Sequence, residues 1–112
     1  MGVYANRILA DVFKDELWFF KTHAKKLFLT FDDGPTKGNT EWILSTLASY
    51  DAKATFFCLG SQVKNFPPQY DLIHEAGHSV GNHTYRHLNG WKSSLMDYVN
   101  DVHLADHFID SV

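Results

Sequence analysis

Short, almost wholly apolar runs alternate along this chain with longer stretches in which apolar residues recur at helical spacing. Residues 27–31 and 54–59 are two such runs, and their length suits strands that are buried on both faces. Gly34 and Pro35 force a turn soon after the first run. Residues 79–82 form a weaker third candidate. The pattern therefore predicts three strands.

Amphipathic stretches precede and follow these runs. The spacing predicts helices over residues 5–20 and 40–50, from Pro67 to Ala76, and from near Ser94 onward. Several residues are typical of helix ends: Asn39 as an N-cap, Pro68 in a first turn, Gly77 after a last turn, and Asp97 at a capping-box position. We expect the last helix to bury one stripe, made of Leu95, Val99, Val102 and Ile109.

From residue 27 onward the predicted order is strand, helix, strand, helix, strand, helix. Such alternation is typical of α/β proteins, in which right-handed crossovers join parallel strands. The chemistry of these folds lies at the carboxyl ends of the strands. Asp32 and Asp33 follow the first predicted strand and His83 follows the third. The topology should therefore bring two polar clusters to one edge of the sheet.

Composition limits the class of protein and its partners. The chain has 112 residues, of which 45% are hydrophobic and 21% charged, with a formal net charge of −3. This is enough for one globular domain, and the weak acidic balance argues against a nucleic-acid partner, which would require a basic patch. Because Cys58 is the single cysteine, an internal disulfide and a Cys-rich zinc module are excluded, and its apolar neighbours predict a buried thiol.

The sequence gives no indication of a membrane segment. No apolar stretch reaches membrane-spanning length. We expect no signal peptide either, because charged residues interrupt the N-terminal region: Arg7, Asp11, Lys14, Asp15 and Glu16. The cellular location stays open.

Two motifs carry candidate chemistry. Asp32 and Asp33 are adjacent carboxylates that repel each other at the end of a buried strand unless a cation is present, although a solvated turn explains the pair equally well. His83 and His87, with one carboxylate, match the metal sites of zinc hydrolases and of non-haem iron enzymes. The alternative is two ordinary surface or core histidines. The shared sheet edge favours the metal site.

Four other histidines form two further pairs at the same spacing. His103 and His107 fall on the polar face of the last helix, so we expect them to be solvated. His74 belongs to a helix, and His78 should pack or form a hydrogen bond beneath the site. Trp91 follows the site closely, and its indole suits stacking on a sugar ring and packing in a core about equally.

The segment Thr30-Phe31-Asp32-Asp33-Gly34-Pro35 resembles the first motif of the polysaccharide deacetylases, a carbohydrate esterase family with the NodB homology domain. His83-Thr84-Tyr85-Arg86-His87 is similar to the second motif of that family, His-[Ser/Thr]-x-x-His. Between the two motifs, the sequence at residues 52–57 and 77–83 also resembles that of the family. The resemblance runs from about residue 26 to the end of the chain.

The resemblance implies a role for each motif residue. Asp32 would be the catalytic base, and Asp33, His83 and His87 would bind a divalent metal ion, most often Zn²⁺. The implied reaction is metal-dependent hydrolysis of acetyl groups on an N- or O-acetylated polysaccharide of the chitin, peptidoglycan or xylan type. The implied fold is a distorted (β/α)7 barrel, and the family is often extracytoplasmic.

The sequence contains only the first two motifs of the family pattern. The third motif, Arg-x-Pro-[Tyr/Phe], a later Asp/Trp motif and a final Leu-x-His motif do not occur in it. Since a (β/α) barrel needs about 200 residues or more, the chain should supply three β-α units of an incomplete barrel. We expect residues 1–25 to be an amphipathic helix and lead-in, and residues 26–112 a partial deacetylase domain. By itself this chain should be inactive and prone to self-association through exposed strand edges.

Two other classes of protein fit part of the pattern. A receiver domain has a similar length and an acidic pair after its first strand, but it requires a phosphoacceptor Asp where His83 stands. A non-catalytic domain that binds a metal or a glycan would explain the missing motifs.

Overall fold

The structure is a computed structural model that describes residues 14–15 and 23–109. The predicted helix over residues 5–20, and with it most of the predicted lead-in at residues 1–25, lies outside the described residues. The other predicted elements lie within the described residues and can be compared with the structure directly.

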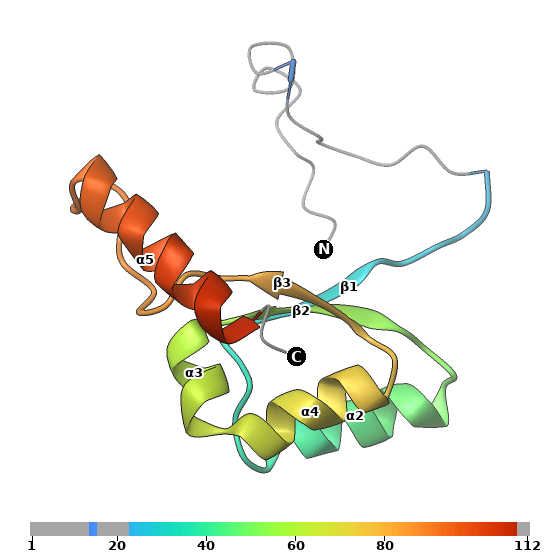
Figure 1. The fold of residues 1–112 in the computed structure, drawn as a ribbon. Coiled ribbons are helices and arrows are strands. Elements are labelled where there is room, and N and C mark those ends of the chain that lie inside the picture. The colour runs from blue at the N-terminus through green and yellow to red at the C-terminus, as the bar shows by residue number, and fades with distance from the viewer. Residues whose placement is uncertain (1–13, 16–22, 110–112) are drawn as a thin grey trace.

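Three short strands form one parallel sheet, as the sequence predicts (Figure 1). They are β1 (Leu29–Asp32), β2 (Ala54–Cys58) and β3 (Ser79–Asn82), in the spatial order β1-β2-β3. The predicted first strand, residues 27–31, begins two residues before β1 and ends one residue before β1 ends. Leu27 and Phe28 precede β1, and their side chains are 90% and 64% exposed. Their apolar character therefore does not mark a buried strand.

The described helices are α2 (Asn39–Ser49), α3 (Gly60–Asn65), α4 (Pro67–Glu75) and α5 (Leu95–Ile109). The sequence predicted α2, α4 and α5 to within a residue or two but not α3, whose six residues are too few to show an apolar period. The N-cap of α2 is Gly38, with φ 85°, so the assignment of Asn39 as N-cap was wrong. The Glu41 carboxylate accepts a hydrogen bond from the Gly38 N–H at 2.6 Å.

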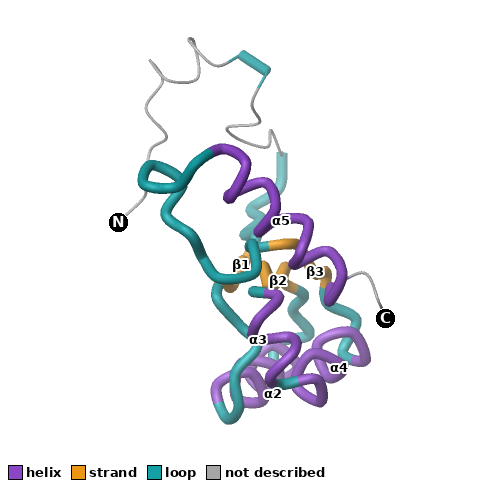
Figure 2. Tube along the Cα trace, turned by 60° about the vertical axis from the view of Figure 1, so that its left-hand side comes forward, coloured by secondary structure: helices purple, strands orange, loops and turns teal. Residues whose placement is uncertain are grey.

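The helices are arranged in layers around the sheet. Helices α2 and α4 lie side by side across one face of the sheet, and α5 packs against α3 and β3 (Figures 1 and 2). Alternate residues of β2 face the helices and are buried: Ala54, Phe56 and Cys58. They form one core with residues from every described helix, namely Leu47, Val63, Tyr70, Ile73, Ala105 and Ile109.

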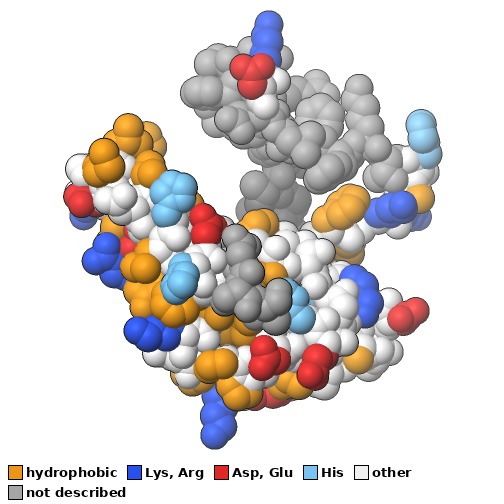
Figure 3. Space-filling view, viewed as in Figure 1, with side chains coloured by type: hydrophobic (Ala, Val, Ile, Leu, Met, Phe, Trp, Pro, Cys, Tyr) orange, Lys and Arg blue, Asp and Glu red, His pale blue; other side chains and the backbone are white. Residues whose placement is uncertain are grey.

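The buried stripe of α5 agrees with the prediction at Ile109 and differs from it elsewhere. Its buried residues are Asp101, Ala105 and Ile109, whereas Leu95 is 80% exposed and Val99 is exposed as well. The first turns of α5 extend beyond the sheet, and Figure 3 shows exposed hydrophobic side chains at that end of the helix. The prediction counted apolar residues alone, whereas the first buried residue of α5 is the charged Asp101.

Within the described part of the chain, no helix has the length and apolar character that crossing a bilayer requires.

Candidate metal centre

The first motif lies where β1 ends. Asp32 is the last residue of β1, and Asp33 follows it with a left-handed backbone conformation, φ 71°. The Leu59 N–H donates a hydrogen bond to the Gly34 carbonyl at 2.9 Å. This bond ties the loop after β1 to the end of β2, which holds the backbone beside Asp33 at the edge of the sheet.

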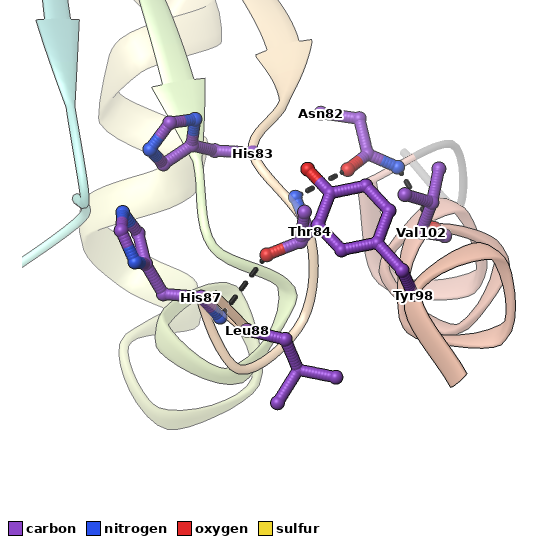
Figure 4. A pocket seen from close by; sticks show the side chains of 7 residues that line it. All are labelled: Asn82, His83, Thr84, His87, Leu88, Tyr98 and Val102. Atoms are coloured by element: carbon purple, nitrogen blue, oxygen red, sulfur yellow. Dashed lines mark hydrogen bonds between the residues drawn. The ribbon is translucent and has the colours of Figure 1, made fainter. Parts of the chain in front are cut away.

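The second motif occupies the loop after β3. The His83 N–H donates to the Cys58 carbonyl at 2.9 Å, and the Gly60 N–H donates to the Thr84 carbonyl at 3.0 Å. Inside the loop, the Asn82 side-chain oxygen accepts the Thr84 N–H, and the Thr84 hydroxyl accepts the His87 N–H at 3.0 Å (Figure 4). These bonds turn both imidazoles toward the same side of the loop.

The two loops bring Asp33, His83 and His87 together, and we call these three residues the candidate metal centre. The Oδ1 atom of Asp33 lies 3.3 Å from Nε2 of His83 and 3.3 Å from Nε2 of His87. All three candidate ligand atoms lie within 4.8 Å of one another.

This geometry fits a small divalent cation. Ligand atoms about 2.0–2.1 Å from a tetrahedral zinc ion are about 3.3–3.4 Å apart, which agrees with both Asp33 separations. Two imidazole nitrogens and one carboxylate oxygen are also a common zinc donor set that leaves further coordination positions open. The donor chemistry and the two separations from Asp33 therefore suit such an ion.

Asp101 in α5 forms hydrogen bonds with the loop that follows β3. Its carboxylate is 1% exposed, and Oδ2 accepts the N–H groups of Tyr85 and Arg86 at 2.9 Å each. Its Oδ1 accepts the Arg86 Nε–H at 2.7 Å. Burial by itself would raise the pKa of Asp101, but the hydrogen bonds from Arg86 and Tyr85 lower it below its usual value. Asp101 is therefore a buried carboxylate anion.

Sequence reasoning missed Asp101, although one signal was present. Asp101, Ala105 and Ile109 recur at intervals of four residues, which places them on one helix face. A charged residue in such a series must find partners when it is buried. That argument identifies Asp101 as a paired residue, but it does not identify the loop that pairs with it.

The other candidate residues occupy different surroundings. Asp32 is exposed and lines, together with Asp33, a pocket of about 240 Å³ beside the start of α2. Trp91 is 100% exposed, so it does not pack in the core that the described residues form. His103 is exposed, with Nδ1 3.6 Å from Asp106, and His107 is also exposed, as expected for a solvated helix face.

A second pocket lies on the α5 side of the histidines. It has a volume of about 310 Å³ and separates the second-motif loop from the middle of α5 (Figure 4). Its lining residues are Asn82, His83, Thr84, His87, Leu88, Tyr98 and Val102. Both histidines therefore border open space.

Comparison with known proteins identifies the class to which this arrangement belongs. A model of the polysaccharide deacetylase family matches residues 20–112. The chain therefore belongs to the polysaccharide deacetylases, which excludes the receiver-domain alternative.

Individual relatives agree with that assignment. A peptidoglycan-N-acetylglucosamine deacetylase of Bacillus cereus is 38% identical over 85 residues, which are 76% of this chain and 40% of the relative. A chitooligosaccharide deacetylase of Rhizobium leguminosarum is 44% identical over 63 residues, or 56% of this chain and 29% of the relative. The chain thus spans well under half of the length of the curated relatives that it matches.

Solved structures show the same partial correspondence. The peptidoglycan deacetylase PdaC of Bacillus subtilis superimposes with a TM-score of 0.71 at 35% identity, covering 74% of this chain and 41% of PdaC. A mutant of a pseudoenzyme of carbohydrate esterase family 4 superimposes with a TM-score of 0.73 at 30% identity, covering 80% of this chain and 33% of the other. The three-stranded sheet matches the N-terminal part of the (β/α)7 barrel of these proteins.

Proposed function

We propose that this chain provides the metal-binding part of the active site of a hydrolase that removes acetyl groups from a polysaccharide. The observation that supports this most directly is the convergence of Asp33, His83 and His87 at the carboxyl edge of a parallel sheet. Membership of the polysaccharide deacetylase family supplies the reaction class.

Each residue at this edge has a proposed role. Asp33, His83 and His87 hold a divalent cation, Zn²⁺ in this proposal, which when bound supplies Lewis-acid activation of a water molecule and of the acetyl carbonyl. Asp32, adjacent to the ligand Asp33, accepts the proton of the attacking water as general base. Trp91 offers a fully exposed indole for stacking on a sugar ring.

The named activities of the relatives suggest the substrate class. They include deacetylation of N-acetylglucosamine and N-acetylmuramic acid in peptidoglycan, and of chitooligosaccharides. We therefore propose an N-acetylated amino-sugar polymer ahead of an O-acetylated xylan. A peptidoglycan substrate would place the protein outside the cytoplasm.

Metal binding tests the candidate metal centre. Saturation with zinc at about 100 times Kd should stabilise the folded chain by about 2.7 kcal/mol, which raises the melting temperature by several degrees in a domain of this size. His83→Ala should abolish this rise because it removes one of three ligands, whereas His103→Ala should preserve it. Differential scanning calorimetry with and without zinc measures both variants. The reverse pattern would mean that the metal binds to the other histidine pair.

The reaction itself is testable in a chimaera. Residues 23–109 joined to the C-terminal part of the Bacillus cereus relative should release acetate from acetylated chito-oligosaccharides, and Asp32→Asn should abolish release while zinc binding persists. Residues 1–112 alone should give no detectable release, since each absent acid–base group removes about 10²–10⁴-fold. A folded, zinc-loaded but inactive chimaera would favour the alternative of a non-catalytic domain, as in the pseudoenzyme that this chain resembles.

A further inference from the structure

We infer that Asp101 is a positioning residue, which holds the loop between His83 and His87 in the conformation that lets both imidazoles reach one cation. The inference rests on the proposed metal centre and adds to it a residue in α5 that touches neither the ion nor a ligand side chain.

The contacts of Asp101 are directed at the middle of that loop. Its two carboxylate oxygens accept three N–H groups, from the backbones of Tyr85 and Arg86 and from the Arg86 side chain, at 2.7–2.9 Å. Tyr85 and Arg86 lie between the two histidines in the sequence. One buried side chain therefore fixes the segment that sets the distance between the two imidazoles.

The loop needs such a support because its conformation is unfavourable. Thr84 and His87 both adopt positive φ, at 69° and 58°, and the loop has no glycine to relieve it. Non-glycine residues persist in this region only where the surrounding structure holds them. The bonds to Asn82 and Thr84 hold the two ends of the loop, and the two backbone N–H groups that Asp101 accepts hold its middle in the absence of metal.

Charge gives Asp101 a second function at the same place. Arg86 directly precedes His87, so its guanidinium would be an unpaired cation beside a site that binds a cation. The Arg86–Asp101 pair, at 2.7 Å, offsets that charge. Replacement of the carboxylate by an amide would place an N–H₂ group or a weaker acceptor against the Arg86 Nε–H, so this bond would be lost or weakened and the charge of Arg86 would no longer be balanced.

Residues in α5 offer a matched control for general destabilisation of the helix. The Ser94 hydroxyl accepts the Asp97 N–H at 3.1 Å and donates to the Asp97 carboxylate at 2.6 Å. Ser94→Ala therefore weakens the N-terminus of the same helix without touching the loop. Arg86→Gln removes the side-chain bond to Asp101 but leaves the two backbone bonds in place.

The experiment compares zinc affinity, cobalt spectra and hydrogen exchange in wild type, Asp101→Asn, Arg86→Gln and Ser94→Ala. Chelator competition should show about 10–100-fold weaker zinc binding for Asp101→Asn, the range seen when supporting residues of metal ligands are replaced. Arg86→Gln should show a smaller loss and Ser94→Ala none. The visible absorption of the cobalt-loaded protein should change for Asp101→Asn alone, because it reports ligand geometry rather than stability.

Metal-free wild type provides a measurement that does not depend on the folding of any variant. The amide protons of Tyr85 and Arg86 should exchange as slowly as those in the buried part of α5, and fast exchange would overturn the inference. Unchanged zinc affinity in folded Asp101→Asn, or an equal loss in Ser94→Ala, would overturn it as well. Failure of the wild-type chain to bind zinc would instead refute the proposed metal centre, and the positioning role with it.

Discussion

At the scale of single residues, surroundings rather than residue type decide what each histidine does. His78 lies on the core side of the sheet, where its side chain is buried and its Nδ1 accepts the Ala54 N–H at 3.3 Å. The Phe56 ring centroid is 5.3 Å from the imidazole centroid. Burial, together with the positive charge of Lys53, lowers the pKa of His78. The neutral ring is therefore the form that the fold requires.

The lowered pKa of His78 predicts a pH-dependent contribution to stability. Because the folded-state pKa is below the unfolded value of about 6.5, this contribution is complete above that pH and declines as pH falls through the folded-state pKa. His78→Leu leaves the Ala54 N–H without its acceptor and should lower the free energy of unfolding by about 1–3 kcal/mol at pH 8.

Urea unfolding at several pH values, with EDTA present to exclude metal binding, checks this expectation. The difference in unfolding free energy between wild type and His78→Leu should shrink between pH 8 and pH 5. A difference that stays constant, or that grows toward acid, would contradict the neutral role of His78.

The residues of the candidate site differ in how far the sequence could predict them. Asp33, His83 and His87 were predictable because each belongs to a short motif, and parallel topology brings both motifs to one edge. The helical spacing marks Asp101 as a buried charged residue, but its place beneath this loop was not predictable, because two of its three bonds come from backbone N–H groups 15 and 16 positions earlier. Nearly every residue has a backbone N–H group, so the sequence does not show which of them bond to Asp101, and only the folded arrangement identifies them.

At the scale of elements, the sequence predicts long regular segments better than their ends. The three strands and the helices α2, α4 and α5 follow from apolar spacing, while the short α3 between β2 and α4 does not. Gly60 opens α3 where a Cβ atom would lie 2.8 Å from the Ala105 Cα. Close packing between α3 and α5 thus sets that position, and such packing depends on the tertiary arrangement.

Gly81 in β3 provides a test of element packing close to the candidate metal centre. Phe57 and Gly81 are register partners in β2 and β3, and a Cβ atom on Gly81 would lie 2.6 Å from the Phe57 ring. Gly81→Ala should therefore lower the free energy of unfolding by about 1–3 kcal/mol, the usual range for overpacking. Because His83 follows two residues later, zinc affinity should fall as well.

Gly90→Ala is the matched control, since its new Cβ atom would meet the Tyr98 ring no closer than 3.5 Å, which is ordinary contact. Its unfolding free energy should stay within about 0.5 kcal/mol of wild type. Chemical denaturation measures both variants. If Phe57→Leu fails to reduce the effect of Gly81→Ala in the double variant, the overlap with the ring is not the cause.

At the scale of the whole molecule, the described residues form an open sheet and leave apolar surface uncovered among themselves. Within residues 23–109, β1 and β3 each pair with β2 alone, so both outer strands present backbone groups that can pair with another chain. An apolar groove of about 320 Å³ lies between β1 and α2, lined by Leu29, Phe31, Trp42, Ile43, Thr46, Leu47, Tyr50 and Ala52. Both features favour contact with a further polypeptide segment or with a second copy.

Self-association of residues 1–112 is the prediction that follows from this open sheet. Sedimentation velocity should show a monomer at low concentration and larger species as the concentration approaches about 100 µM, the range in which exposed strand edges associate. Thr30→Lys in β1 and Ser79→Lys in β3 place charges on exposed positions of the two edge strands and should shift the transition to higher concentration. Lys37→Arg, in the turn before α2, keeps its charge away from both edges and serves as the control.

Monodisperse wild-type monomer up to that concentration would contradict the prediction. Equal association in wild type and in the double lysine variant would instead assign the contact to the apolar groove, and Trp42→Ser would then be expected to weaken it.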